Sequence, residues 1–237
     1  MPIIDAKNLS RAFGSSLILK NISLQVSGGS VYGLVGLNGA GKTTLIRVLL
    51  GLIEKDGGSV EVAGFDPWRH QTEFYRMVGA ALESDGFFGN LTVKENLRIF
   101  AAAKGIGEKQ ADEYFEKYWG ETDIYTSTKK VKHLSRGQRV QCGLCRAFLG
   151  WPTIYFFDEP TVNLDFLAYE HFKSMAHEAK SRGAALLISS HQLEVIDDLC
   201  ERVGLLRNGE LEEVERLGQK FSDIIKLMYE TSRIGSV

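Results

Sequence analysis

Residues 36–44 read Gly-Leu-Asn-Gly-Ala-Gly-Lys-Thr-Thr, and this stretch decides the fold. The apolar run Val31–Val35 before it is typical of a buried strand, and Leu45–Leu50 after it has helical periodicity. Strand, glycine-rich loop and helix with the pattern G-x-x-x-x-G-K-[ST] are the parts of a P-loop. Backbone N–H groups of such a loop and of the helix start hold phosphates. The stretch therefore predicts a nucleotide-binding protein.

The side chains and the backbone of this loop have separate expected roles. Lys42 can reach the terminal phosphates, and the hydroxyl of Thr43 can bind Mg²⁺. A glycine-rich turn with a chance Gly-Lys-Thr is the alternative, and the flanking strand and helix speak against it. The remaining expected nucleotide contacts are Gly36, Asn38, Gly39, Ala40, Gly41 and Thr44.

Composition excludes several classes of protein. The 237 residues are 44% hydrophobic and 24% charged with a net charge of -2, which does not indicate general nucleic-acid affinity. No apolar run approaches ~18 residues, so no membrane span is expected, and the first residues lack the features of a signal peptide. Three cysteines give no disulfide framework and suit the cytoplasm. Cys142 and Cys145 have C-x-x-C spacing, but core packing is favoured over a metal site with Cys200.

Strand and helix patterns alternate along both ends of the chain. Strands are expected at 3–9, 17–26, 59–63, 77–82, 153–157, 184–189, 203–206 and 210–212, and helices at 167–181 and 192–200. Residues 10–14 read as a turn, and Asn208-Gly209 as a type I′ hairpin turn. The expected fold class is α/β: a P-loop NTPase core with a mostly parallel sheet flanked by helices, and an antiparallel β subdomain.

The middle of the chain has a different, helical pattern. Thr92–Glu95 forms an expected capping box that starts one helix, and Glu108–Trp119 is a second, amphipathic helix. A third helix follows Leu134-Ser135 and ends near Gly150. We expect a single domain over 1–237, with an inserted α-helical subdomain at 84–150 between core segments 1–83 and 151–212, and a helical C-terminal segment at 213–237.

A second strong pattern lies in residues 154–160, Ile-Tyr-Phe-Phe-Asp-Glu-Pro. Two carboxylates follow a buried strand, at the sheet edge where open α/β folds bind their ligands. Asp158 is suited to hold Mg²⁺, and Glu159 to polarise the water that attacks the γ-phosphate. Alone, this pair would be a solvated loop; with the P-loop it predicts a hydrolytic site.

A third pattern, Leu134-Ser135-Arg136-Gly137-Gln138, completes a family resemblance. With the two patterns above it resembles the ATP-binding cassette (ABC) ATPases over nearly the whole chain, matching four positions of their LSGGQ signature. The resemblance implies that Ser135, Gly137 and Gln138 contact ATP held by a second ATPase subunit, so that ATP joins two subunits. A homodimer is expected, with a paired heterodimer as the alternative. The pentapeptide alone is equally consistent with a plain Ser-capped helix.

Further positions match the same family. Phe13 lies where the family has an aromatic residue that stacks on adenine, although a packed core residue has the same pattern. Asp165, in Asn163-Leu164-Asp165, resembles the D-loop that crosses the dimer interface and also reads as a helix N-cap. His191 resembles the switch histidine that contacts the γ-phosphate, although a histidine after a strand is usually a surface residue.

Two positions depart from the family pattern. Glu83 replaces the usual glutamine and is expected near Mg²⁺ and the attacking water, as both catalytic and metal residue. Arg136 replaces the first signature glycine, and its side chain either points away from the nucleotide or adds a cation to it. With Asp158-Glu159-Pro160 and the overall length, these features look closest to the ABC-2-type exporter ATPases.

The resemblance implies a function in transport. ATP hydrolysis would drive dimer closing and opening, and a separate transmembrane permease subunit at the cytoplasmic face of the membrane would receive that motion. Residues 83–97 are the expected docking surface, with Phe87 and Phe88 as two exposed aromatic side chains. The alternatives are a soluble, non-transport ABC ATPase acting on ribosomes or DNA, and a cassette that binds ATP only to assemble a complex. The sequence names no transported substrate.

Overall fold

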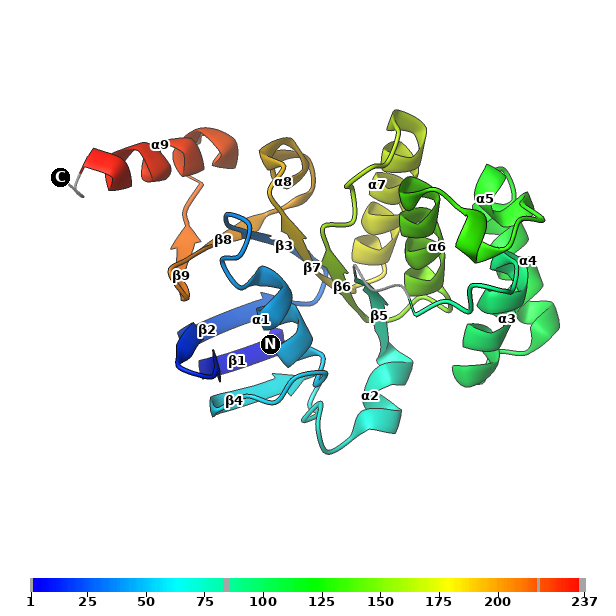
Figure 1. Cartoon of the computed structure of the whole chain (residues 1–237), viewed down its shortest axis with the longest axis horizontal. Coiled ribbons are helices and arrows are strands. Elements are labelled where there is room, and N and C mark those ends of the chain that lie inside the picture. The colour runs from blue at the N-terminus through cyan, green and yellow to red at the C-terminus, as the bar shows by residue number, and fades with distance from the viewer. Residues whose placement is uncertain (1, 83–85, 217, 235–237) are drawn as a thin grey trace.

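A six-stranded sheet forms the centre of the computed structural model, which describes residues 2–82, 86–216 and 218–234 (Figure 1). Neighbouring strands are parallel except for the last pair, which is an antiparallel hairpin. Positive φ angles at Asn208 and Gly209 fit the type I′ turn expected there. In spatial order the strands are β5 (Val78–Ala81), β6 (Ile154–Asp158), β7 (Ala185–Ser190), β3 (Ser30–Val35), β8 (Arg202–Arg207) and β9 (Glu210–Val214).

A smaller antiparallel sheet lies beside the first. Its strands, in order, are β2 (Ser16–Ser27), β1 (Pro2–Phe13) and β4 (Gly57–Val62). Helix α1 (Lys42–Leu49) contributes Leu45 and Leu49 to one hydrophobic core together with Tyr32 of β3 and residues of the small sheet. Val31 of β3 points to a second core on the other face. Because both faces are covered, the central strands are apolar at nearly every position.

A helical arm extends from one end of the central sheet, beyond β5 and β6 (Figure 1). Thr92 caps its first helix through the expected capping box with Glu95, and Ser135 caps its last helix in the same way with Gln138. The arm consists of α3 (Val93–Ala103), α4 (Glu108–Trp119), α5 (Asp123–Thr126), the 3₁₀ helix Val131–His133 and α6 (Arg136–Phe148).

Four more helices surround the central sheet. They are α2 (Gln71–Met77), α7 (Phe166–Ser181), α8 (Leu193–Leu199) and α9 (Phe221–Ile234). Helix α9 lies at the end of the molecule opposite the helical arm (Figure 1). Among the described residues, no helix has both the length and the apolar character that a membrane crossing requires.

The structure corrects several expected boundaries. β1 continues to Phe13, through residues expected to form a turn, because register shifts let it stay paired with β2. β9 extends to Val214, which pairs with Val203, so the C-terminal segment expected to be helical from residue 213 begins as a strand. The short helices α2 and α5 were not predicted, since four to seven residues carry too little periodicity.

The three cysteines are buried and none is in a disulfide, as expected for core residues. Burial raises the pKa of the Cys145 thiol well above its usual value, and the neighbouring Cys142 adds to the shift. A raised thiol pKa disfavours the reactive thiolate. Cys142 and Cys145 therefore serve packing between α6 and the sheet.

Candidate nucleotide-binding site

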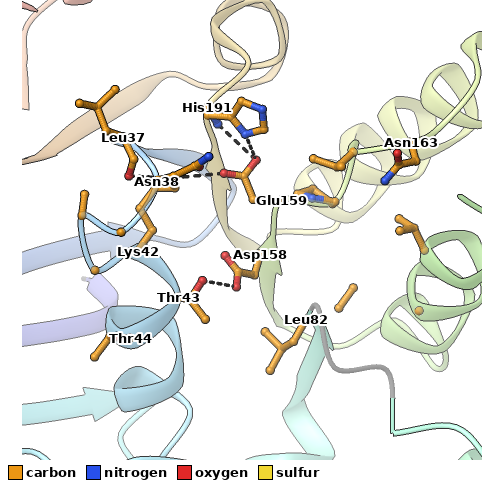
Figure 2. Close-up of a pocket in the computed structure, with 18 of the residues that line it drawn as sticks. Leu37, Asn38, Lys42, Thr43, Thr44, Leu82, Asp158, Glu159, Asn163 and His191 are labelled. Atoms are coloured by element: carbon orange, nitrogen blue, oxygen red, sulfur yellow. Dashed lines mark hydrogen bonds and ion pairs between the residues drawn. The ribbon is translucent and has the colours of Figure 1, made fainter. Parts of the chain in front are cut away.

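The carboxyl ends of β3, β6 and β7 meet at a cleft of about 860 Å³. Residues 37–44 form one wall, and Asp158, Glu159 and His191 line the centre (Figure 2). Arg136 and Arg139 of α6 complete the lining on the side of the helical arm. Parallel strands bring these distant segments together because their carboxyl ends lie at one edge of the sheet.

The glycine-rich loop depends on two glycines for its shape. Gly41 precedes α1 with φ of 107°, a left-handed conformation that side chains other than glycine rarely adopt. A Cβ atom at Gly36 would come within 2.5 Å of the Leu206 carbonyl oxygen. The loop therefore turns tightly into α1, whose first N–H groups are free of helix partners and can bind an anion.

Lys42 is a buried cation at the floor of this cleft, with 6% of its surface exposed. Its Nζ atom donates to the Gly36 carbonyl oxygen at 2.7 Å and lies 3.3 Å from Glu159 Oε1. A buried ammonium needs such partners, because burial without them costs several kcal/mol. Phosphate oxygens attract an ammonium group more strongly than the Gly36 carbonyl oxygen does. The Lys42 ammonium is therefore placed to move from this carbonyl to a bound phosphate.

Thr43 and Asp158 place hard oxygen ligands side by side. Thr43 Oγ1 donates to Asp158 Oδ2 at 2.7 Å (Figure 2). Ser189 Oγ donates to Asp158 Oδ1 at 2.6 Å. A hydroxyl and a carboxylate are the ligands Mg²⁺ prefers, with phosphates and waters filling its other positions. In the described part of the chain no three His, Cys, Asp or Glu side chains gather into a metal site. The donor set fits a Mg²⁺ that arrives with a nucleotide.

Glu159 is held in a strained conformation beside Asp158. Its φ angle is +52°, which costs a non-glycine residue on the order of 1 kcal/mol or more. Its N–H donates to Ser189 Oγ at 3.0 Å. Its Oε2 lies 2.8 Å from His191 Nδ1 and accepts from the His191 backbone N–H at 3.2 Å. These contacts aim the carboxylate into the cleft between Lys42 and His191 (Figure 2).

Most of the other residues predicted to bind nucleotide line the same cleft. Phe13 lies at its edge, half-exposed, with the Arg11 guanidinium 4.8 Å from the centre of its ring. Gly36 is buried beneath the lining. Asn38, Gly39, Ala40, Gly41 and Thr44 are part of the lining.

The signature and D-loop residues lie elsewhere. Ser135 is exposed at the start of α6, and neither it nor Gly137 nor Gln138 lines the cleft. Gly137 packs against the backbone of Asn163, since a Cβ there would come within 2.3 Å of the Asn163 carbonyl oxygen. Asp165 caps α7 by accepting from the Ala168 N–H at 2.8 Å and borders a different hollow. Within one chain the cleft therefore contains the phosphate loop and the carboxylates, but not Ser135, Gly137 or Gln138.

The remaining predicted residues are Glu83, Phe87 and Phe88. Glu83 lies outside the described residues. Phe87 is not an exposed aromatic: its ring packs edge-on against Phe100 at 5.5 Å, with the Arg146 guanidinium 5.0 Å from it. Phe88 is exposed, as expected, with 54% of its surface accessible.

Ser189 and Asn163 were not among the predicted site residues. Ser189 is fully buried and hydrogen-bonds both site carboxylate residues, and it lies opposite Asp158 in the β6–β7 register. Asn163 lines the cleft with φ of +65°. The local sequence gives no sign that Ser189 belongs to the site, because its role arises from strand pairing. For Asn163 there was a sign, since asparagine tolerates a positive φ better than most residues.

Residues 19–162 match the ABC transporter family. The chain belongs to this family. It is 38% identical over 214 residues to the bacitracin transport ATP-binding protein BcrA of Bacillus licheniformis, covering 89% of this chain and 69% of BcrA. It is 32% identical to the ABC transporter ATP-binding protein NatA of Bacillus subtilis, covering 81% and 79%. A solved ATP-binding subunit of an ABC transporter superposes with a TM-score of 0.85 at 27% identity, covering 95% and 93%.

These matches show that the chain binds ATP. The chain is an ATP-binding ATPase subunit of the ABC transporter family, with the P-loop NTPase fold of ABC cassettes. The sequence predictions of family, fold and ATPase activity are thereby confirmed. The roles of individual site residues rest on the geometry above.

Proposed function

We propose that this chain is the ATPase subunit of an ABC exporter, in which two copies close on two ATP molecules and move a separate membrane subunit. The proposal rests on one observation: Ser135 is exposed outside the cleft. The cleft itself is lined by Lys42, Asp158, Glu159 and His191. Relatives named for bacitracin transport and lantibiotic transport support a compound of those kinds as the transported substrate.

ATP binding begins with the loop and α1. Lys42 shifts from the Gly36 carbonyl to the β- and γ-phosphates, and backbone N–H groups at the start of α1 donate to them. Thr43 and Asp158 would hold Mg²⁺. When bound, that ion neutralises phosphate charge. Phe13 offers its exposed ring to the adenine.

Glu159 then activates water. Its carboxylate accepts a proton as the water attacks the γ-phosphate in line. His191 holds one oxygen of that carboxylate, which fixes its direction, and the strained backbone places it close to Lys42. Loss of the γ-phosphate removes the charge that Lys42 neutralised, so the pocket can open.

The second copy completes the site. The start of α6 is exposed, and Ser135 at its N-cap presents a hydroxyl beside the first N–H groups of the helix. These groups suit the γ-phosphate of an ATP held by another copy. A solved cassette of this fold is dimeric, although at 23% identity it supports the fold alone.

Phe88 is the proposed anchor for the membrane subunit. Buried Asn96 accepts from the Phe88 N–H at 2.7 Å and donates to the Phe88 carbonyl at 3.1 Å. These two bonds fix the backbone while the ring faces solvent. A fixed, exposed aromatic residue is typical of an interface anchor because little side-chain entropy is lost on binding.

ATPase and dimerisation assays test the catalytic part of the proposal. Purified wild type should hydrolyse ATP, and Glu159→Gln should bind ATP without turnover and accumulate as a dimer in size-exclusion chromatography. Ser135→Ala in the Glu159→Gln background should weaken that dimer. If Glu159→Gln with MgATP stays monomeric, and wild type shows no turnover even with its membrane subunit, the proposal fails.

Co-purification tests the membrane part. Phe88→Ala should reduce recovery of the membrane subunit, whereas Ile99→Ala, another exposed hydrophobic residue of the arm, should not. Equal recovery with both variants would remove Phe88 from the docking surface.

A further inference from the structure

A run of basic residues on the helical arm leads into α6. Between residues 124 and 157 the chain has no aspartate or glutamate, although its overall net charge is -2. Lys129, Lys130 and Lys132 lie in this stretch, and all three are exposed. We call these three residues the lysine strip. The strip concentrates positive charge on one part of a slightly acidic chain.

The lysine strip is joined to the loop that carries Phe88. The Val131 N–H donates to the Leu91 carbonyl oxygen at 2.9 Å. The Lys132 N–H donates to the Gly89 carbonyl oxygen at 3.0 Å. Because these backbone bonds pair the two segments, the strip and the exposed ring of Phe88 belong to one surface of the arm.

The positive charge of the strip is largely uncompensated within the chain. Among the described residues, no carboxylate forms an ion pair with any of its three lysines. Lys132 Nζ donates to the neutral amide oxygen of Asn90 at 2.9 Å. Hydrogen bonds from Thr92 lower the pKa of Glu95, and the charge of Lys130 adds to this shift. Since the Glu95 carboxylate caps α3, the strip keeps a net positive charge.

The form of this surface favours a flat, anionic partner. The three lysines line neither the nucleotide cleft nor the hollow that Asp165 borders. Cations beside an exposed aromatic ring are typical of a membrane interface, where the ring lies at the level of the headgroups and ammonium groups attract lipid phosphates. An acidic protein would need carboxylates matched to each lysine, whereas a leaflet with anionic lipids offers its charges as a plane.

We propose that the lysine strip binds the headgroups of anionic lipids in the leaflet around the membrane subunit. The inference rests on the proposed function, in which Phe88 docks against that subunit and brings the strip to the membrane. Each lysine near an anionic surface strengthens binding roughly fivefold, so the three together contribute on the order of 100-fold. The lipid thus adds attraction that does not depend on the sequence of the membrane subunit.

Vesicle sedimentation tests the chemistry of the ligand. The wild-type chain should bind vesicles of equal parts phosphatidylcholine and phosphatidylglycerol at low salt, but not vesicles of phosphatidylcholine alone. In about 1 M salt, where the Debye length is ~3 Å, this binding should be lost. A wild-type chain that does not distinguish the two kinds of vesicle overturns the inference.

Neutralisation of the strip tests its part in this binding. The triple variant Lys129→Gln, Lys130→Gln, Lys132→Gln should bind the equal-part vesicles on the order of 100-fold more weakly. The matched control, Lys7→Gln, Lys220→Gln, Lys226→Gln, removes the same charge from exposed positions outside the arm and should bind as wild type does. Both variants should keep the wild-type ATPase rate and unfolding temperature. Equal vesicle binding by both variants overturns the inference.

A dye beside the strip tests which face meets the membrane. Thr128→Cys, at an exposed position, is labelled with nitrobenzoxadiazole, because Cys142, Cys145 and Cys200 are buried and do not compete for the label. Its fluorescence should rise with the equal-part vesicles and stay constant with phosphatidylcholine alone. The same dye at Glu212→Cys, exposed on β9, should not respond. A response at Glu212 and none at Thr128 overturns the inference.

Recovery of the membrane subunit in detergent separates a lipid from a protein partner. The strip variant should recover that subunit as well as wild type does, because detergent removes the lipid plane. If it loses the subunit while its vesicle binding is unchanged, the strip binds an acidic segment of the subunit, and the lipid inference is wrong although the exporter proposal stands. If wild type recovers no membrane subunit, the exporter proposal fails, and the vesicle and dye measurements still decide the lipid contact.

Discussion

Ser189→Ala is the sharpest test of how the site is built, because it changes one buried hydroxyl that does not line the cleft. Ser189 Oγ donates to Asp158 Oδ1 at 2.6 Å and accepts from the Glu159 N–H at 3.0 Å. Removal of the oxygen frees one carboxylate oxygen of Asp158 and leaves the Glu159 N–H with only the Ser189 carbonyl oxygen, at 3.2 Å. Asp158 and Glu159 therefore each lose a hydrogen bond to the same side chain.

The expected loss follows from the type of bond. A hydrogen bond to a charged group contributes ~1.5–3 kcal/mol. If that energy is lost from the transition state, kcat/KM for MgATP falls by about 10- to 150-fold. Asp158 then turns more freely, so a higher Mg²⁺ concentration is needed for half-maximal activity. A merely structural role would not change the Mg²⁺ requirement.

Steady-state ATPase activity is measured across a Mg²⁺ titration at fixed ATP, with thermal unfolding to confirm the fold. Ser190→Ala is the matched control, since Ser190 is also fully buried and its hydroxyl bonds within its own turn, to the backbone of Gln192. It should keep the wild-type Mg²⁺ requirement. A wild-type Mg²⁺ profile for Ser189→Ala, or the same shift for Ser190→Ala, would refute the reasoning.

Three further predictions follow from other contacts. Glu159→Gln should lower kcat by about 10²- to 10⁴-fold, the usual contribution of a general base, while a fluorescent ATP analogue binds as before; retained turnover would contradict the assignment. Asn96→Ala should lower the free energy of unfolding in urea by about 2–4 kcal/mol, because the Phe88 N–H and carbonyl lose their buried partner; a loss under 1 kcal/mol would show that water replaces it. Burial lowers the pKa of Lys104 from its ordinary 10.5 to about 8 in the folded chain. Between these pH values the unfolded chain therefore binds more protons, so wild type should gain stability relative to Lys104→Gln as pH rises from 8 to 10.5, by on the order of 3 kcal/mol. Denaturation at pH 7, 9 and 10.5 checks this, and a constant difference between the two proteins would contradict it.

The local parts of the site were predictable because their hydrogen bonds join residues close in sequence. Gly41 ends the loop and starts α1, and Thr92 caps α3 as the spacing to Glu95 indicates. The apolar run before Asp158 likewise required a buried strand with its acids at the end. Such patterns are read correctly from sequence because propensity and capping act over a few residues.

Other parts depended on which strands and helices became neighbours. The local sequence does not indicate which of Phe87 and Phe88 packs inward. In the structure it is Phe87, because its ring packs against Phe100 and Arg146. Asp165 satisfies both a D-loop resemblance and an N-cap pattern, and in one chain the structure places it as the cap, outside the nucleotide cleft. The end of β1 followed its pairing with β2 rather than the turn residues in its sequence.

The sequence by itself determined the chemistry: a phosphate loop, two acids after a strand and a Ser-capped helix can be recognised because each is a short, continuous motif. Only the tertiary structure decided how the motifs share a site. The β6–β7 register sets Ser189 against Asp158, and α6 carries Ser135 away from the cleft that its own chain builds. Packing over tens of residues fixes these positions, and no local pattern encodes it.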